Sequence, residues 1–285
     1  MPDIAETPLA ALRVREALEE DVATGDATTL ALVDPGAEAS ALLLTRQPCS
    51  VSGGGVAALV FRTVDPALRV ETLLPDGARA SAGEGILRVS GKAASILTAE
   101  RVALNFMQRM CGIATMTARF VDAVKPYGTT VLDTRKTTPC LRAFEKYAVA
   151  CGGGTNHRFG LYDRILMKDN HRKLWQGGDP GRLDLAVEAA RAKYPGLVVE
   201  VEVETLEECR SALRARPEWL LLDNMTCDLM RACVALAKGV SKTEASGGIT
   251  LERAAEVAAT GVDAISLGCL THSVPSTDLS LEITL

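Results

Sequence analysis

The second part of the chain alternates short apolar runs with stretches of helical periodicity. From about residue 129 onward, such runs predict six strands, at Thr130–Thr134, Ile165–Lys168, Val198–Glu202, Trp219–Leu222, Thr243–Ser246 and Ala264–Leu267. Apolar residues at helical spacing predict helices near Arg182–Tyr194, Leu206–Arg214, Cys227–Lys238 and Leu251–Thr260. Strands separated by helices of this length are typical of a parallel sheet built from βαβ units.

The first part of the chain, up to about residue 115, has a mixed pattern. The spacing of apolar residues predicts a helix over Leu12–Asp21 and a longer one over Ala94–Met110. Between them, strands are predicted at Ala39–Thr45, Leu68–Leu74 and Ile86–Val89. Hairpin-type strands beside helices favour an α+β sandwich.

Polar residues or glycines end nearly every predicted strand of the second part. They are Arg135-Lys136, Lys168-Asp169, Glu202, Asp223, Ser246-Gly247-Gly248 and Gly268. In a βα barrel, the carboxyl ends of all strands converge on one face, where ligands bind. A doubly wound sheet is the alternative, although convergence from six strands favours the barrel. We expect an α/β protein with an N-terminal α+β sandwich domain over 1–115, to which the C-terminal tail can return, and a βα-barrel domain over 116–275.

Composition argues against several classes of protein. The chain of 285 residues has a formal charge of −5 and 4% aromatic residues, unlike proteins that bind nucleic acids or anionic membranes. Its eight cysteines form no C-x-x-C pair, so we expect reduced thiols. The start, MPDIAETPLA, does not resemble a signal peptide, and no apolar run reaches spanning length. We therefore expect a cytoplasmic protein.

Basic residues are concentrated between Leu132 and His171, beside a run of three glycines. The cluster consists of Arg135, Lys136, His157, Arg158 and Lys168. Cations near strand ends are rarely buried unless they are paired, and arginine donates two parallel hydrogen bonds to a carboxylate or phosphate. We predict a site for a small polyanion. For His157 a purely structural hydrogen-bonding role is the alternative, and His272 is assigned no role.

Acidic residues follow two successive predicted strands, as Glu202 and Asp223. Because Glu200, Glu202 and Glu204 alternate along one strand face, at least one of them must point inward. Two carboxylates on neighbouring strands can hold Mg²⁺ or accept hydrogen bonds from vicinal sugar hydroxyls. Pairing with a structural cation is the alternative.

Glycines end the last two predicted strands. Ser246-Gly247-Gly248 precedes a predicted helix, so its backbone amides can bind a phosphate without a side-chain charge. Gly268 admits close approach to the backbone of the neighbouring strand. A Ser-Gly-Gly turn alone is more often only a turn, but barrels commonly bind phosphate at this place.

Several motifs closely resemble the quinolinate phosphoribosyltransferases, nearly end to end. They are GDATT, ERVALNFMQRMCGIAT, DTRKTTP, EKYAV, GGGTNHR, KDNH, EVEVE, LLLDNM, EASGGI and AISLGCLTHS. The resemblance implies an incomplete barrel of about seven strands. It also implies the conversion of quinolinate and phosphoribosyl pyrophosphate (PRPP) to nicotinate mononucleotide, pyrophosphate and CO₂, in NAD biosynthesis. Mg²⁺ is the implied cofactor. The implied assembly is a homodimer, or a hexamer of three dimers, in which the counterpart of Arg101 reaches into the partner's active site.

The residue pattern and the resemblance together define the candidate site. Its candidate substrate-binding residues are Arg101, Thr134, Arg135, Lys136, His157, Arg158, Lys168, Glu202, Asp223, Ser246, Gly247, Gly248, Gly268, Cys269 and Leu270. The candidate catalytic residues are Lys136, Glu202 and Asp223. The last two are also the candidate ligands of Mg²⁺.

Two positions depart from the family's pattern, Cys140 where glycine is usual and Cys111 where serine is common. The sequence Lys168-Asp169-Asn170 favours the biosynthetic enzyme over paralogues linked to molybdenum uptake, which generally lack it. Two further enzymes are compatible with these residues: a paralogue that uses another base, such as nicotinate, and a Schiff-base lyase with Lys136 or Lys168 as nucleophile. Outside the enzymes, a polyanion-binding regulatory protein is also compatible with them.

Overall fold

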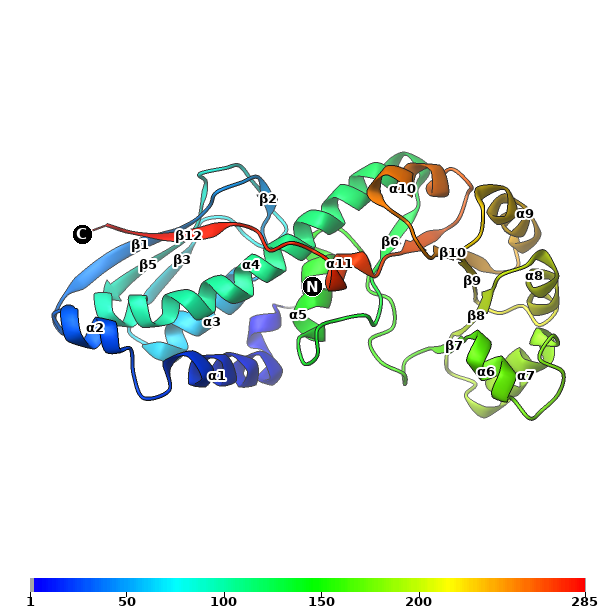
Figure 1. The fold of residues 1–285 in the computed structure, drawn as a ribbon, viewed down its shortest axis with the longest axis horizontal. Helices are drawn as coiled ribbons and strands as arrows, with labels where there is room; N and C mark the ends of the chain where they lie inside the picture. Colours follow the sequence, from blue (N-terminus) through cyan, green and yellow to red (C-terminus); the bar gives the residue numbers. More distant parts are fainter. Residues whose placement is uncertain (1–2, 285) are drawn as a thin grey trace. The chain divides into compact units, whose positions relative to one another are not determined.

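The structure is a computed structural model that describes residues 3–284. These residues form two compact units, each built from segments that are far apart in the sequence (Figure 1). The first unit contains the residues up to Ala118, the segment Thr138–Gly153 and the C-terminal segment from Ser273 onward. The second contains Arg119–Thr137 and Gly154–His272.

A four-stranded antiparallel sheet forms the centre of the first unit. Its order is β12-β1-β5-β3, formed by Leu279–Thr284, Glu38–Thr45, Gly85–Lys92 and Arg69–Thr72. Buried residues alternate along β1, so one face of the sheet packs on the core. The C-terminal tail returns to this unit as β12, beside β1.

Helices cover this sheet, together with a short two-stranded ladder. They are η1 (Ile4–Glu6), α1 (Pro8–Val22), α2 (Ala27–Leu32), α3 (Gly54–Val64), α5 (Arg142–Cys151) and most of α4, and the ladder joins β2 (Cys49–Ser50) to β4 (Arg79–Ala80). The start of α1 is specified locally, since Thr7 accepts a hydrogen bond from the Ala10 amide and Pro8 takes the first helical position. Helix α1 packs on α3.

The helix α4, Ala93–Val124, is longer than the predicted Ala94–Met110. It continues through Gly112, where an added Cβ would lie 2.3 Å from the carbonyl oxygen of Pro275. Glycine at this position therefore serves the close approach of the C-terminal segment and does not end the helix.

A six-stranded parallel sheet forms the second unit. Its order is β6-β11-β10-β9-β8-β7, formed by Thr130–Leu132, Ala264–Ser266, Lys242–Ser246, Trp219–Asp223, Val199–Val203 and Ile165–Met167. The strands from β7 to β11 pair in chain order, and β6, the first of the six, pairs with β11, the last. A doubly wound sheet places its first strand in the interior, so this pairing favours the barrel arrangement.

Helices precede, connect and follow these strands in the chain. They are η2 (Lys125–Tyr127), α6 (Asp169–Leu174), α7 (Leu183–Lys193), α8 (Leu206–Leu213), α9 (Cys227–Ala237), α10 (Leu251–Ala258) and α11 (Cys269–His272). The predicted α/β fold with an N-terminal sheet domain is confirmed, and each predicted strand of the second unit is present. Helices α2, α3, α5, α6 and α11 were not predicted.

Candidate active site

A cavity of about 840 Å³ lies in the second unit, where residues at the carboxyl ends of β6 to β11 converge. All candidate substrate-binding residues line it except Arg101 and Leu270. Arg101 is exposed on α4, and the side chain of Leu270 is fully buried. The strand ends that the sequence predicted to converge are therefore brought together.

Two arginines of the cavity lie near enough for their charges to interact. Burial, followed by the positive charge of Arg135, lowers the pKa of Arg158. The guanidinium Nη1 of Arg158 donates a hydrogen bond to the carbonyl oxygen of Arg164, at 3.2 Å. Because like charges repel in a partly buried site, an anion that contacts both guanidinium groups is favoured there.

Lys136 lies on the loop that follows β6. Its amide donates to Oγ1 of Thr134 at 3.0 Å, and its carbonyl oxygen accepts from Oγ1 of Thr271 at 2.7 Å. A Cβ at Gly268 would lie 3.0 Å from Cδ of Lys136 and 2.9 Å from Nε2 of His272. Glycine at this position thus leaves room for both side chains beside β11, and a larger residue would displace them. His272, to which the sequence assigned no role, also lines the cavity.

Two carboxylates lie at the ends of the neighbouring strands β8 and β9. Glu202 is nearly buried and forms an ion pair with Lys168, while Oδ2 of Asp223 accepts a hydrogen bond from the side chain of Asn224 at 2.8 Å. Carboxylate oxygens that face a common cavity are the donor set that Mg²⁺ prefers. The residues present therefore fit this cation.

The turn after β10 approaches the turn after β9 closely. Gly247 and Gly248 have left-handed φ angles of +95° and +58°. The Asn224 amide donates to the carbonyl oxygen of Ser246 at 2.9 Å, and a Cβ at Gly247 would lie 2.1 Å from Oδ1 of Asn224. Glycine is thus required here, and its amides precede α10 in the arrangement of an anion-binding turn.

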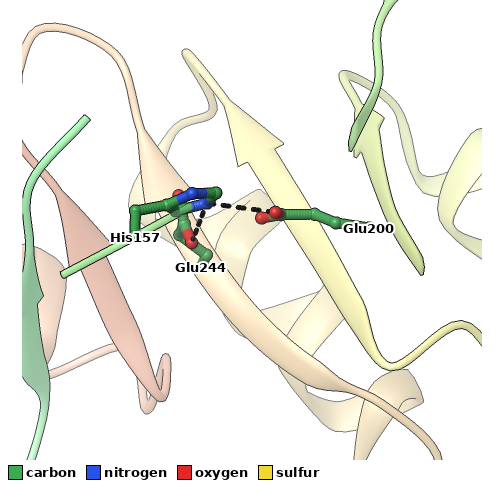
Figure 2. A group of neighbouring side chains, drawn as sticks. All are labelled: His157, Glu200 and Glu244. Carbon is green, nitrogen blue, oxygen red and sulfur yellow. Dashed lines mark ion pairs between the residues drawn. The ribbon is translucent and has the colours of Figure 1, made fainter. Parts of the chain in front are cut away.

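His157, Glu200 and Glu244 form a buried cluster in the interior of the second unit (Figure 2). Nε2 of His157 lies 3.1 Å from Oε2 of Glu200 and 3.4 Å from Oε2 of Glu244. Arg164 adds a cation, with Nη1 at 3.1 Å from the same oxygen of Glu200. On the other side of the ring, the amide of Arg158 donates to Nδ1 at 2.6 Å. Both ring nitrogens of His157 therefore have protein partners.

The charges within this cluster shift the pKa values of its three residues. Burial alone would lower the pKa of His157, but the carboxylates of Glu200 and Glu244 raise it to about 9. Burial, and then the charge of Glu200, raises the pKa of Glu244. The pKa of Glu200 is lowered, because His157 and Arg164 outweigh the effect of burial. The pair of His157 and Glu244 thus retains a proton at neutral pH.

Sequence reasoning missed several residues of the cavity. Glu244, Asn224 and His272 line the cavity but were not among the candidate residues. The signal for Asn224 is its place directly after Asp223 at a strand end. Glu244 lies in the middle of its strand, where only the pairing of the strands reveals the direction of its side chain.

The fold and the cavity define a class. Parallel strands whose carboxyl ends carry cations, paired carboxylates and a glycine turn characterise barrel-type α/β proteins that bind phosphorylated ligands. Within this class, the family model of the quinolinate phosphoribosyl transferase C-terminal domain matches residues 113–282, and that of the N-terminal domain matches residues 26–111. The chain belongs to the quinolinate phosphoribosyltransferase family.

Relatives from several organisms are similar over nearly the whole chain. A carboxylating nicotinate-nucleotide pyrophosphorylase of Mycobacterium leprae is 42% identical over 276 residues, which cover 95% of each chain. A probable enzyme of the same name from Bacillus subtilis is 41% identical and covers 93% of this chain and 90% of its own. The solved structure of the nicotinate-nucleotide pyrophosphorylase of Francisella tularensis has a TM-score of 0.92 and 37% identity, and the match covers 100% of both chains.

Within residues 3–284, none of the helices combines the length and the apolar character that crossing a membrane requires.

Proposed function

We propose that the protein is a quinolinate phosphoribosyltransferase, which converts quinolinate and PRPP to nicotinate mononucleotide, pyrophosphate and CO₂. The observation that carries the proposal is the cavity itself. It combines two mutually repelling arginines for a dicarboxylate with paired carboxylates and a glycine turn for a phosphorylated sugar. Neither a Schiff-base lyase nor a polyanion-binding regulatory protein requires all three parts.

Positioning of the base is assigned to Arg135, Arg158 and Lys168. Quinolinate carries two neighbouring carboxylates, and bidentate hydrogen bonds from arginine fix both the place and the plane of such a group. Held in this way, the pyridine nitrogen attacks C1 of the ribose as pyrophosphate leaves. Lys168 must exchange its partner Glu202 for the substrate, so binding of the base releases Glu202 toward the sugar.

Charge that develops in the transition state is stabilised by groups fixed in advance. Lys136 and the amides after Ser246 lie where they can neutralise the pyrophosphate and the ribose phosphate. Glu202 and Asp223 would accept hydrogen bonds from the ribose hydroxyls and would hold Mg²⁺. When bound, that ion would supply positive charge to the leaving pyrophosphate.

The assembly that we propose is a homodimer with shared active sites. Its support is Arg101, which is exposed on α4 and does not line the cavity. The family resemblance assigns the corresponding residue to the partner's site, where Arg101 of the partner subunit would add a cation for quinolinate.

The proposal is tested by incubating the purified protein with PRPP, Mg²⁺ and carboxyl-labelled quinolinate. We expect equal amounts of CO₂, pyrophosphate and nicotinate mononucleotide, and none of them after chelation of Mg²⁺. Nicotinate in place of quinolinate tests the paralogue with another base. Product from nicotinate but not from quinolinate would replace the proposed function by that of the paralogue.

A further inference from the structure

The proposed reaction, on which this inference rests, requires a proton at a ring carbon. When the carboxylated mononucleotide loses CO₂, the bond between C2 and its carboxylate breaks and the electron pair stays on C2. That carbon must then bind one proton. A carbanion is a far stronger base than a carboxylate or an imidazole, so a donor held beside C2 transfers its proton readily.

Glu244 lines the cavity in which the base would bind, where such a donor is needed. Its side chain is fully buried on β10, yet it contributes to the wall of the cavity. Neither of its oxygens has a hydrogen-bond partner of ordinary geometry among the described residues, although Nε2 of His157 lies 3.4 Å from Oε2. A buried carboxyl group without such partners is costly if it is ionised and much less so if it carries a proton.

The charges around Glu244 leave one acidic proton for the pair of Glu244 and His157, and this proton lies on Glu244 while Nδ1 of His157 accepts from the Arg158 amide. Arg164 balances Glu200, because their side chains are in contact at 3.1 Å. The neutral imidazole of His157 carries one ring proton. The pair of His157 and Glu244 is electrically neutral when it holds one further, acidic proton. The three ligand atoms of the cluster lie within 4.8 Å of one another, as in a metal site. However, the guanidinium of Arg164 already supplies the positive charge that a metal ion would bring.

The cluster is also in contact with Arg158, one of the two arginines assigned to the carboxylates of the base. His157 and Arg158 are adjacent in the chain, and the Arg158 amide contacts the imidazole ring. Because Arg135, Arg158, His157 and Glu244 line the same cavity, a base whose carboxylates contact the two arginines would turn its carboxylate-bearing carbons toward this cluster. Of the other donors, Lys168 contacts a carboxylate of the bound base in the proposed arrangement, and arginine does not release protons at neutral pH.

We propose that Glu244 is the general acid that protonates C2, and that Nε2 of His157 holds the protonated carboxyl group of Glu244 in place until CO₂ has left. The proton moves to C2 from Glu244, which lines the cavity. Afterwards the pair holds a carboxylate and a neutral imidazole, and it regains a proton from solvent when the product leaves. Glu200 and Arg164 keep their charges throughout, with Arg158 and Ser266 as the other polar neighbours.

The variant Glu244→Gln tests this role, because the amide keeps the shape but supplies no acidic proton. Rapid-quench reactions would follow pyrophosphate, the carboxylated mononucleotide and nicotinate mononucleotide separately. We expect pyrophosphate release close to the wild-type rate, a formation of nicotinate mononucleotide that is slower by about a hundredfold, and accumulation of the carboxylated mononucleotide. Glu188→Gln, an exposed position on α7, is the matched control and should behave as wild type.

The pH dependence of the wild-type enzyme gives a second test that needs no variant. His157 has its pKa raised to about 9, so the pair loses its proton as the pH rises through that value. The carboxylated mononucleotide should therefore accumulate above about pH 9 and not at pH 7.

The outcomes separate this inference from the proposed function. If the wild-type protein releases no pyrophosphate from PRPP and quinolinate, the proposed function fails. If it does, and Glu244→Gln slows pyrophosphate release and product formation by the same factor, Glu244 is not the acid. A proportion of carboxylated mononucleotide that stays constant between pH 7 and pH 10 in the wild type would also overturn the inference.

Discussion

Single residues of the cavity differ in how their charges are balanced. Lys168 is paired with Glu202, whereas burial, and then repulsion from the like charge of Arg135, lowers the pKa of Arg158. A bound dicarboxylate relieves that repulsion, so the ligand-free protein holds these two groups in a less favourable state than the complex does. The arginines should therefore contribute more to quinolinate affinity than a solvated charge would.

Replacing Arg158 by alanine tests this contribution. We expect Arg158→Ala to weaken quinolinate binding by more than about tenfold, because a carboxylate of the ligand loses its partner in a partly buried site. Calorimetric titration would measure the affinity. Arg231→Ala, on the exposed face of α9, removes a similar charge far from the cavity and should have no effect. An unchanged affinity in Arg158→Ala would exclude this residue from the site.

The carboxylate of Asp223 has a different role, which Asp223→Asn tests. The amide is nearly isosteric, so the circular dichroism spectrum and the melting temperature should be retained. Turnover should fall by about a hundredfold, because the ribose and Mg²⁺ lose a charged partner. Near-normal turnover at saturating Mg²⁺ would show that Asp223 is structural.

The sequence predicts those residues of the site whose positions carry a local signal. Arg135, Lys168 and Asp223 each follow an apolar run directly, so the strand end identifies them. Glu244 lies in the middle of a short strand, KTEAS, where a glutamate ordinarily faces solvent. Glu244 is buried because the side chains of Glu200 on β8 and Glu244 on β10 both point into the interior, where His157 contacts them from a loop. No local sequence pattern encodes that combination.

At the scale of elements, helix α3, which was not predicted, begins through contacts with a residue distant in sequence. Helix α3 begins within a run of three glycines, Gly53 to Gly55, a pattern typical of a loop. In the structure, Asp76 accepts hydrogen bonds from the amides of Gly53 and Gly54, at 3.0 Å each, and so satisfies the helix N-terminus. That cap lies more than twenty residues away in sequence. The strands of the second unit were predicted because their apolar runs are contiguous.

Helix α4 allows a prediction in which two effects have opposite sign. Helix propensity alone favours alanine over glycine by about 1 kcal/mol. At Gly112, however, the new Cβ would lie 2.3 Å from the carbonyl oxygen of Pro275. We expect Gly112→Ala to destabilise the protein by about 1–3 kcal/mol, because overpacking outweighs propensity. Thermal unfolding would measure the change.

A matched control for this substitution is Gly196→Ala. A Cβ at Gly196 would meet nothing within 4 Å, and the backbone there is not left-handed. Its melting temperature should stay near that of the wild type. If Gly112→Ala raised the melting temperature, the approach of the C-terminal segment would not be the reason for the glycine.

At the scale of the whole molecule, the proposal of a shared active site depends on Arg101. This residue and Asn105, one helical turn further along α4, are both exposed. If Arg101 completes the partner's site, Arg101→Ala should be nearly inactive while it remains folded and dimeric. Mixed with the inactive Lys136→Ala, it should recover part of the activity, because some heterodimers carry one site with both residues intact. Differently tagged subunits would show by co-purification that exchange has occurred.

Exchange without any recovery would contradict the shared site. Arg101 would then act within its own chain or not at all. Arg15→Ala, an exposed arginine on α1, controls for the loss of a surface charge, and it should be active without a partner.

The pairing of the strands also determines when the protein becomes functional during its synthesis. Strand β6 can pair only after β11 has been synthesised, and β1 gains its partner β12 only at the end of synthesis. The first strand of each sheet therefore pairs with the last strand of that sheet to be made. At the usual rate of translation this wait is on the order of ten seconds or more. During that time both early strands expose edges that other chains can join. Gly268 follows β11, so a ribosome-bound chain that stops before β11 lacks one wall of its binding site.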